Sequence, residues 1–424
     1  MHKIIALFML CWLPGCYALD INNIYIPPAS DAEYPPDVAF MILDLKYRPG
    51  ALKVCEFGQG VLSGFVGHDM LYGPGAVYER LWEFLTSLRL PILMVRPSCR
   101  TEHSLFNDSG CKHLDIGRFA RKVDQCIPTF ASVFPDPVKS ELAGIPKRLA
   151  EAKALAVPCR FGDFLKAYDA IGGFATGMIA LDYVARQFTL NKGLTHALFA
   201  NDPVVERYRP KALILPRSYR PTMAEEIQSQ LGADAYVIKP LNAWRGEGIL
   251  MATKHELDKV LKHALMPGQG RYDHWARTRN SNFIVEVLEH SMPIMVHQRP
   301  YDPTMRVILG LAYDAGQVTM RILGAYWKMP HHPSTSIASL EERYVSHIVP
   351  GNAFSSAVVA PAILAKVEQE ISQFMPYVYR KMIALKHEKK LLNKLHRFLW
   401  SKGKPPMCGL SECENNEGLD AGGR

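Results

Sequence analysis

Apolar residues dominate the chain from position 38 to 60, broken only by a few polar side chains and by Arg48-Pro49-Gly50 near the middle. Proline and glycine favour a tight turn, and apolar runs of this length are typical of strands. The pattern therefore predicts a β-hairpin over 38–60. Its first strand carries Asp44 and its second carries Glu56.

The next part of the chain mixes two periodicities. Residues 76–90 and 140–155 repeat apolar positions at helical spacing, whereas 91–97 form a short apolar run typical of a strand. No chemical motif stands out between 75 and 187. The pattern therefore predicts a mixed α/β region here.

Short helices and strands alternate from residue 191 onward. The pattern predicts a helix and a strand within 191–219, a helix at 222–232, a strand opening 236–249, an amphipathic helix at 254–265, a strand at 282–290, a hairpin over 304–330, and one or two basic helices at 361–400. Residues 401–424 have the composition of a disordered tail. The fold class is therefore α+β (α/β).

The composition is that of a globular protein with two or three domains: 424 residues, 48% hydrophobic and 21% charged. The net charge of +8 favours anionic ligands, but the Lys and Arg residues are too scattered to indicate nucleic acid as a partner. A basic, amphipathic segment at 386–400 predicts peripheral contact with an anionic membrane or, alternatively, packing on its own domain.

The first 18 residues have the pattern of a signal peptide. A basic start and an apolar run at 4–13 precede Cys16-Tyr17-Ala18, so cleavage is expected after Ala18, and the run is too short to span a bilayer. We therefore expect an exported protein, periplasmic or secreted. It would be cytoplasmic if these residues form a buried strand instead.

Export would leave seven cysteines in an oxidising compartment. Two pairs lie close enough in sequence to form disulfides, Cys99 with Cys111 and Cys408 with Cys413, but the sequence does not decide the pairing. No pair has the C-x-x-C spacing of a metal site.

One motif has the composition of a phosphate-binding loop. In YVIKPLNAWRGEGI, residues 236–249, a strand ends in Lys239 and is followed by Arg245, Gly246 and Gly248. Glycines let backbone N–H groups turn toward an anion, and the two cations add charge. The alternative is an ordinary glycine-rich hairpin turn.

The order of motifs from residue 192 to 352 resembles an ATP-grasp domain, in which two small α+β lobes hold ATP between them. LNKGLTHALF is similar to the stretch that carries the family's first nucleotide lysine, and VIKPLNAWRGEGI is similar to the second lysine strand with its phosphate lid. The resemblance implies a set of phosphate-binding residues: Lys192, Lys239, Arg245, Gly246 and Gly248.

Later motifs extend this resemblance. FIVEVLEH is similar to the adenine hinge, so backbone groups from Glu286 to Leu288 would meet the purine and Glu289 would bind the ribose hydroxyls. SHIVPGN, ending at Asn352, resembles the loop that closes the site. Two further motifs, DPTMRV and VTMRILGAYWK, supply cations that in the family meet the γ-phosphate and the acyl-phosphate, namely Arg306, Arg321 and Lys328.

The family's metal-binding carboxylates are missing from their usual place, because no apolar strand after Arg343 carries one. The hairpin at 38–60 has the shape of that missing piece, with Asp44 and Glu56 as Mg²⁺ ligands. This order resembles circularly permuted ATP-grasp ligases, such as the eukaryotic glutathione synthetases and bacterial relatives. In them a substrate domain is inserted between the metal hairpin and the nucleotide lobes.

The chain departs from this pattern at one position. Where the family has Glu-x-Asn, the sequence has Glu56-Phe57-Gly58, and Gln59 is the nearest amide. Glycine offers no side-chain ligand, so the second metal position is in doubt.

Together these expectations predict an ATP-dependent carboxylate–amine ligase that uses ATP and Mg²⁺ on small-molecule or peptide substrates. The departure at Gly58 and the signal peptide favour an alternative, an exported non-catalytic binding protein on a degenerate scaffold. Transfer of phosphate without ligation is a third possibility. The expected segments are 1–18, 19–73 with the hairpin, 74–187 as substrate domain, 188–360 as nucleotide lobes, 361–400 and 401–424.

Overall fold

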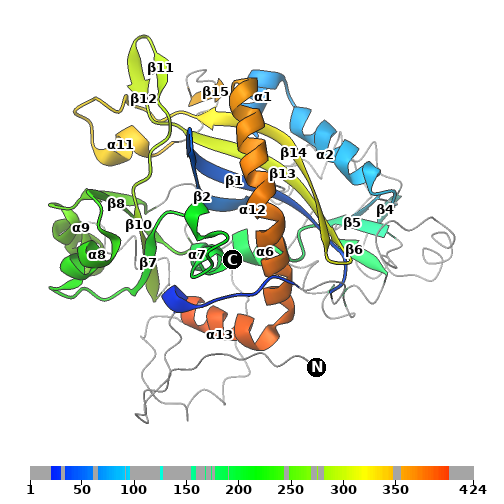
Figure 1. The fold of residues 1–424 in the computed structure, drawn as a ribbon, viewed down its shortest axis with the longest axis horizontal. Helices are drawn as coiled ribbons and strands as arrows, with labels where there is room; N and C mark the ends of the chain where they lie inside the picture. Colours follow the sequence, from blue (N-terminus) through cyan, green and yellow to red (C-terminus); the bar gives the residue numbers. More distant parts are fainter. Residues whose placement is uncertain are drawn as a thin grey trace.

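The computed structural model in Figure 1 combines three main sheets with a long helix that crosses the largest of them. The predicted signal peptide, most of the predicted substrate domain and the predicted tail at 401–424 lie outside the described residues. The structure describes residues 21–29, 34–60, 65–90, 92–95, 125–127, 154–158, 168, 173, 177–189, 191–242, 248–268, 275, 281–346 and 355–400.

The largest sheet joins the predicted N-terminal hairpin to strands from the second half of the chain. Its antiparallel order is β15–β14–β13–β1–β2. The predicted hairpins are confirmed, and the first becomes part of the same sheet as the second. The strands are β1 (Asp37–Arg48), β2 (Ala51–Gln59), β13 (Thr304–Asp314), β14 (Gln317–Lys328) and β15 (Ser356–Val358).

Helices cover both faces of this sheet. The long helix α12 (Pro361–His387) packs its apolar side against one face, in a core that includes Leu43 and Trp327. On the other face, α1 (Val66–Tyr72) and α2 (Ala76–Ser87) lie over small residues of the strands. A Cβ added at Gly324 would come within 2.7 Å of His68 Nε2, and one at Gly310 within 2.6 Å of Phe84. These glycines therefore let the two helices approach the sheet closely.

A second antiparallel sheet carries the phosphate-loop motif. Its order is β7–β10–β8–β9, with strands β7 (Ala212–Pro216), β8 (Ala235–Pro240), β9 (Leu250–Thr253) and β10 (Asn282–Val287). Helices α8 (Met223–Leu231) and α9 (Leu257–Leu265) lie against one face of this sheet (Figure 1) and form an apolar core with it. The other face bears Lys239 and Glu286, and it turns toward β2.

The predicted substrate domain contributes a parallel sheet to the described structure. Its order is β4–β3–β5–β6, with strands β3 (Ile92–Val95), β4 (Gln125–Ile127), β5 (Ala154–Pro158) and β6 (Met178–Ala180). The end of the helix predicted for 140–155 is wrong, because Ala154 and Leu155 belong to a strand; the rest of that prediction lies outside the described residues. Apolar runs this short do not distinguish a buried strand from a helix end.

Shorter elements complete the fold. Figure 1 shows the small hairpin β11 (Ile294–Val296) and β12 (Arg299–Tyr301) projecting beyond the second sheet. The others are the 3₁₀ turns η1 (Ile21–Asn23) and η4 (Glu206–Tyr208), and the helices α6 (Ala185–Thr189), α7 (Lys192–Phe199), α11 (Leu340–Tyr344) and α13 (Lys389–Trp400).

The apolar stripe of α13 does not face solvent. Leu392, Leu395 and Leu399 are buried in the main core, and Leu399 packs on Gly193 at the start of α7. The apolar stripe of this helix therefore packs on its own domain, as the alternative predicted, and contact of its basic face with an anionic membrane stays a prediction. Among the described residues, no helix is long and apolar enough to cross a bilayer.

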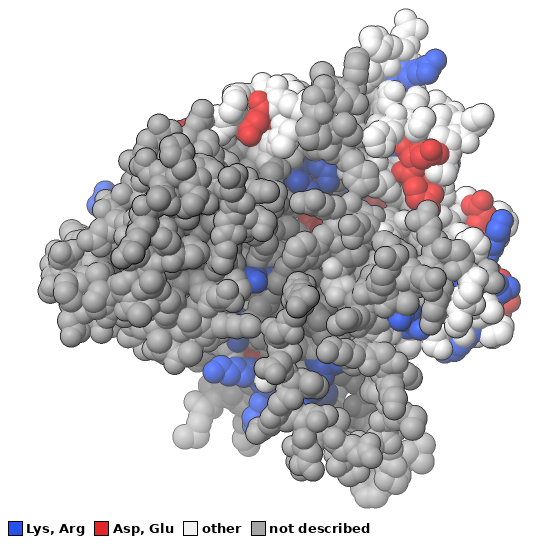
Figure 2. All heavy atoms as spheres, turned by 180° about the vertical axis from the view of Figure 1, so that it is seen from behind, with Lys and Arg blue, Asp and Glu red and all other residues white. Residues whose placement is uncertain are grey.

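Charges of both signs are interspersed on the described surface. In Figure 2, acidic and basic side chains alternate along the edge seen at the right. Several exposed pairs belong to the second sheet and its helices, including Arg220 with Glu226 and Lys262 with Asp258.

A buried acidic cluster lies where β1 begins. The Tyr379 hydroxyl on α12 donates a hydrogen bond to Asp37, and the Phe40 N–H donates to Asp182 at 2.6 Å. Burial raises the pKa of Asp37 to about 7, against the hydrogen bond from Tyr379, and burial also raises the pKa of Asp182. At neutral pH the cluster therefore holds protons that the unfolded chain would release.

This cluster predicts a pH-dependent stability. Unfolded Asp37 ionises near its ordinary pKa of 3.8, whereas folded Asp37 stays protonated until about 7. The unfolded state therefore binds fewer protons between these values, and the free energy of unfolding falls by about 4 kcal/mol as pH rises through that window. We expect Asp37→Asn to remove this part of the fall, measured by urea unfolding across pH. Asp234→Asn, at an exposed site, serves as the control, and an unchanged profile for Asp37→Asn would contradict the assignment.

Candidate functional site

A row of polar side chains crosses the largest sheet from strand to strand. Asp44 on β1 lies directly opposite Glu56 on β2 and Arg306 on β13, and Arg306 lies opposite Tyr326 on β14. Residues directly opposite each other point to the same face of a sheet. The fold thus brings together residues more than 250 positions apart in the sequence.

Asp44 is held by two cations. Arg306 donates from Nε to Oδ1 at 2.8 Å and from Nη2 to Oδ2 at 2.9 Å, and Lys328 Nζ lies 2.7 Å from Oδ2. Burial alone would raise the pKa of Asp44, but the two cations more than offset this and hold it well below its usual range. Asp44 is therefore ionised at any physiological pH.

Glu56 belongs to the same electrostatic cluster. Burial would lower the pKa of Arg306, but Asp44 and, more weakly, Glu56 raise it above its usual value. On its other side, Glu56 Oε1 lies 3.5 Å from Lys192 Nζ. Glu56 thus links the large sheet to α7.

A β-bulge at Cys55 sets which side chains of β2 face the site. Asp44 pairs with Glu56 but Leu45 pairs with Val54, so Cys55 is the extra residue. A bulge shifts the alternation of side chains by one position. As a result Lys53 and Glu56, three residues apart, both lie on the polar side.

Gly58, the position that departs from the family pattern, is covered by an apolar side chain. Gly58 lies opposite Ile42, and a Cβ at Gly58 would come within 2.5 Å of the Ile42 side chain. Gln59 pairs opposite Met41, so it points to the other face of the sheet and does not replace the missing amide.

Lys239 lies on the second sheet in a buried ionic cluster. Its Nζ is 2.5 Å from Glu286 Oε2, and Arg209 Nη2 is 2.5 Å from Glu286 Oε1. Burial would lower the pKa of Lys239, but the charge of Glu286 raises it. Arg209 also donates from Nη1 to the carbonyl of Val54 at 2.8 Å, which joins this cluster to β2.

Lys192 is the first residue of α7 and lies between the cluster around Asp44 and the cluster around Glu286. Asn191 caps the helix by accepting from the N–H groups of Gly193 and Leu194, as N-cap asparagines do. The Lys192 N–H donates to the carbonyl of Leu241, two residues after Lys239. The two predicted phosphate lysines therefore lie at one junction.

The predicted adenine hinge follows β10. Leu288 joins Val237 and Met251 in a small apolar cluster, and its N–H donates to the carbonyl of Ala235. Glu289 lies 4.0 Å from Lys53 Nζ.

The remaining predicted residues have different outcomes. The structure does not bring Arg321 into the cluster, because its side chain is half exposed and pairs with Glu83 on α2 at 3.0 Å. Five positions along the strand separate it from Tyr326, a span of about 17 Å. The Gly248 carbonyl accepts from Trp275 Nε1 at 3.0 Å. Arg245, Gly246 and Asn352 lie outside the described residues.

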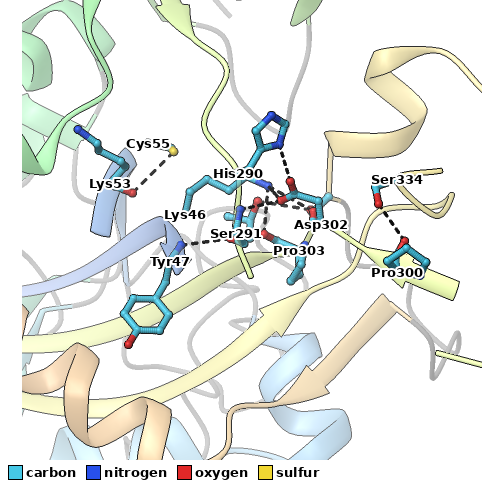
Figure 3. A network of polar contacts seen from close by, with 12 residues as sticks. Lys46, Tyr47, Lys53, Cys55, His290, Ser291, Pro300, Asp302, Pro303 and Ser334 are labelled. Carbon is cyan, nitrogen blue, oxygen red and sulfur yellow. Dashed lines mark hydrogen bonds and ion pairs between the residues drawn. The ribbon is translucent and has the colours of Figure 1, made fainter. Parts of the chain in front are cut away.

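Beside Asp44, a second polar network was not predicted from the sequence. Figure 3 shows Lys46, His290 and Ser291 converging on Asp302. Lys46 Nζ lies 2.8 Å from Asp302 Oδ1, and His290 Nδ1 lies 2.7 Å from Oδ2. Lys46 could have been found from strand alternation, since it is two residues from Asp44 and shares its face. Arg209 has no such sequence signal.

Asp44 and Glu56 fit one kind of metal site. Directly opposite residues on neighbouring antiparallel strands have Cβ atoms about 5 Å apart. Mg²⁺ in phosphate-handling sites is commonly held by one or two carboxylates, with water and phosphate oxygens completing the shell. A cluster of three or more His, Cys, Asp or Glu suited to a metal does not occur in the described part of the chain. The pair therefore suits Mg²⁺ that arrives with a phosphate ligand.

Comparison with solved structures finds distant likenesses. No protein-family model and no curated protein matches the sequence. A gamma-glutamylcysteine synthetase-like protein of Methylobacillus flagellatus KT has a TM-score of 0.36 at 10% identity, covering 85% of this chain and 91% of its own. D-alanyl-alanine synthetase A of Vibrio cholerae O1 biovar eltor has 0.31 at 11%, covering 69% and 82%. Values this low do not establish a shared fold.

The contrast between Asp44 and Glu83 gives a matched test, since each pairs with an arginine. Asp44→Asn leaves Arg306 and Lys328 mostly buried without their carboxylate, which we expect to cost about 3 kcal/mol of unfolding free energy. Glu83→Gln breaks an exposed pair and should cost less than about 1 kcal/mol. Urea unfolding of the two variants measures the difference, and equal effects would show that Asp44 is not a buried ionic anchor.

Proposed function

We propose that the protein is an ATP-dependent carboxylate–amine ligase on a circularly permuted ATP-grasp scaffold. One observation carries the proposal: acids of the first hairpin lie in contact with cations from strands and a helix far along the chain. Asp44 bonds Arg306 and Lys328, and Glu56 pairs with Lys192. This is the juxtaposition of carboxylates and cations that a magnesium nucleotide requires.

The charge pattern supports a triphosphate as ligand. The cations of the site are paired with carboxylates of the same site, namely Lys192 with Glu56, Lys239 with Glu286, and Arg306 and Lys328 with Asp44. A magnesium triphosphate offers both charges at once. Phosphate oxygens would take over the cations, and Mg²⁺ would take over Asp44 and Glu56.

Each residue then has a role. Lys192 and Lys239 would bind phosphates, and Arg306 and Lys328 would stabilise the charge that develops on the transferring phosphoryl group. Glu289 would bind the ribose, beside the apolar cluster around Leu288. Arg245, Gly246 and Gly248 would close over the phosphates, with Asn352 in the second closing loop. Arg321 has no part in the site.

The proposed reaction has two steps. A substrate carboxylate oxygen attacks the γ-phosphorus, the bond to the β-phosphate oxygen breaks, and ADP leaves. An amine nitrogen then attacks the acyl carbon, phosphate leaves with the former carboxylate oxygen, and the nitrogen loses a proton to give the amide. No side-chain nucleophile is required, and Mg²⁺ supplies charge neutralisation when it is bound.

A second candidate is favoured by the closed position at Gly58. With Gly58 where the family has an amide, and Ile42 filling the space above it, the site has two carboxylates for a metal rather than a fuller set. Such a site would suit a non-catalytic, nucleotide-binding protein. Export through the predicted signal at residues 1–18 would fit this candidate, since ATP is scarce outside the cytoplasm.

We expect Lys239→Ala to lower the affinity for MgATP by at least about tenfold, because the variant lacks a buried cation next to the proposed phosphates. Isothermal titration calorimetry measures this directly. Lys254→Ala is the matched control, since Lys254 is half exposed and pairs with Asp234 on the surface. Equal affinities for the two variants would remove Lys239 from the site.

Release of ADP separates the two candidates. The protein is incubated with MgATP and a pool of amino acids and small peptides, and ADP and new amide products are measured together. A ligase gives both, and transfer without ligation gives ADP without amide. Binding of MgATP with no turnover identifies the non-catalytic protein.

A further inference from the structure

Glu286 lies buried between two cations from different parts of the chain. Lys239 is 2.5 Å from one carboxylate oxygen and Arg209 is 2.5 Å from the other, and all three side chains are less than a tenth exposed. If Lys239 binds a phosphate, as the proposed function requires, this ion pair must loosen.

Releasing Lys239 raises the question of what then neutralises Glu286. Two other titratable groups face it. Burial lowers the pKa of His196 to about 4, and burial raises the pKa of the Cys55 thiol to about 11, so both are neutral at neutral pH. A buried carboxylate without a cation is strongly unfavourable. Among the described neighbours of Glu286, Arg209 is therefore the group that can carry the compensating charge.

Arg209 is anchored independently of Lys239. Its guanidinium donates to the carbonyl of Val54 on β2, and its own carbonyl accepts from Lys53 Nζ at 3.3 Å. It follows η4 on a segment that Lys53 also holds through the carbonyl of Arg207. Arg209 can thus keep its contact with Glu286 while the flexible Lys239 side chain moves.

We propose that Arg209 is a positioning residue: it retains the charge of Glu286, so that Lys239 can exchange this carboxylate for a phosphate of the nucleotide. Arg209 itself needs no contact with the nucleotide. Without Arg209, Glu286 depends on Lys239 alone and competes with the phosphate for it. The inference rests on the proposed function, because it concerns the same phosphate site.

The test is a pair of variants measured by calorimetry with MgATP and with inorganic triphosphate. R209M should weaken both ligands by about tenfold or more, since Lys239 is then the remaining partner of Glu286. R209M/E286Q should regain affinity to within about threefold of wild type, because the competing charge is gone. E286Q alone should bind at least as tightly as wild type. Thermal unfolding of each variant reports whether it is folded.

Failure of the proposed function and failure of the positioning role give different results. If wild-type protein binds neither ligand, the proposed function fails. If wild type binds and R209M binds equally well, or if the double variant stays as weak as R209M, the positioning role is overturned. Should R209M not fold, R209K and R209K/E286Q give the same comparison. The shorter lysine cannot hold both Glu286 and the Val54 carbonyl as the guanidinium does, so R209K should bind more weakly than R209K/E286Q.

Discussion

The site depends on the ionic contact of Asp44 with Arg306 and Lys328. These partners are 262 and 284 positions away in sequence, and all three side chains are largely removed from water. A buried charge is tolerated only with a partner. Side chains alternate along a strand, so a shift of β1 by one residue would turn Asp44 into the apolar face that packs on α12. The ion pairs and the apolar core therefore specify the same register, and that register brings the first hairpin to the later strands.

The paired charges also limit what can bind. A simple anion could draw Arg306 and Lys328 away from Asp44, but it would leave that buried carboxylate without a cation. A free divalent ion would bind Asp44, but it would leave Arg306 and Lys328 without their carboxylate. A polyanion that carries its own divalent ion would satisfy both sets together, which is the reason for proposing a metal–nucleotide rather than either component alone. The same reasoning applies on the second sheet, where Glu286 has two cations and can give up one.

Much of this arrangement could be predicted from the sequence, because the evidence is local. The apolar runs and turn residues in 38–60 and 304–328 predict the hairpins and put Asp44, Arg306 and Lys328 on strands. Features of the site that have no local signal in the sequence were not predicted. The bulge at Cys55 changes the face of the sheet on which Lys53 lies, and no residue type in this strand indicates a bulge. Arg321 shares the strand and charge of a site residue, but its distance along β14 takes it to the surface beside Glu83. Arg209 lies in a turn, where periodicity carries no information.

The apolar boundary of the polar row bears on the chemistry. One step beyond Asp44 and Arg306 along their strands, the residues on the same face are Ile42 and Ile308, with Gly58 and Gly324 opposite them. Ile42 occupies the space above Gly58, while His68 of α1 fills the space above Gly324. The asparagine expected at position 58 from the family resemblance is therefore not a single missing ligand. Its volume is already taken, and an amide at 58 could enter only if Ile42 moved. A metal here would rely on Asp44, Glu56 and the phosphates themselves, so its affinity would be coupled to the nucleotide more tightly than in a site with a complete set of protein ligands.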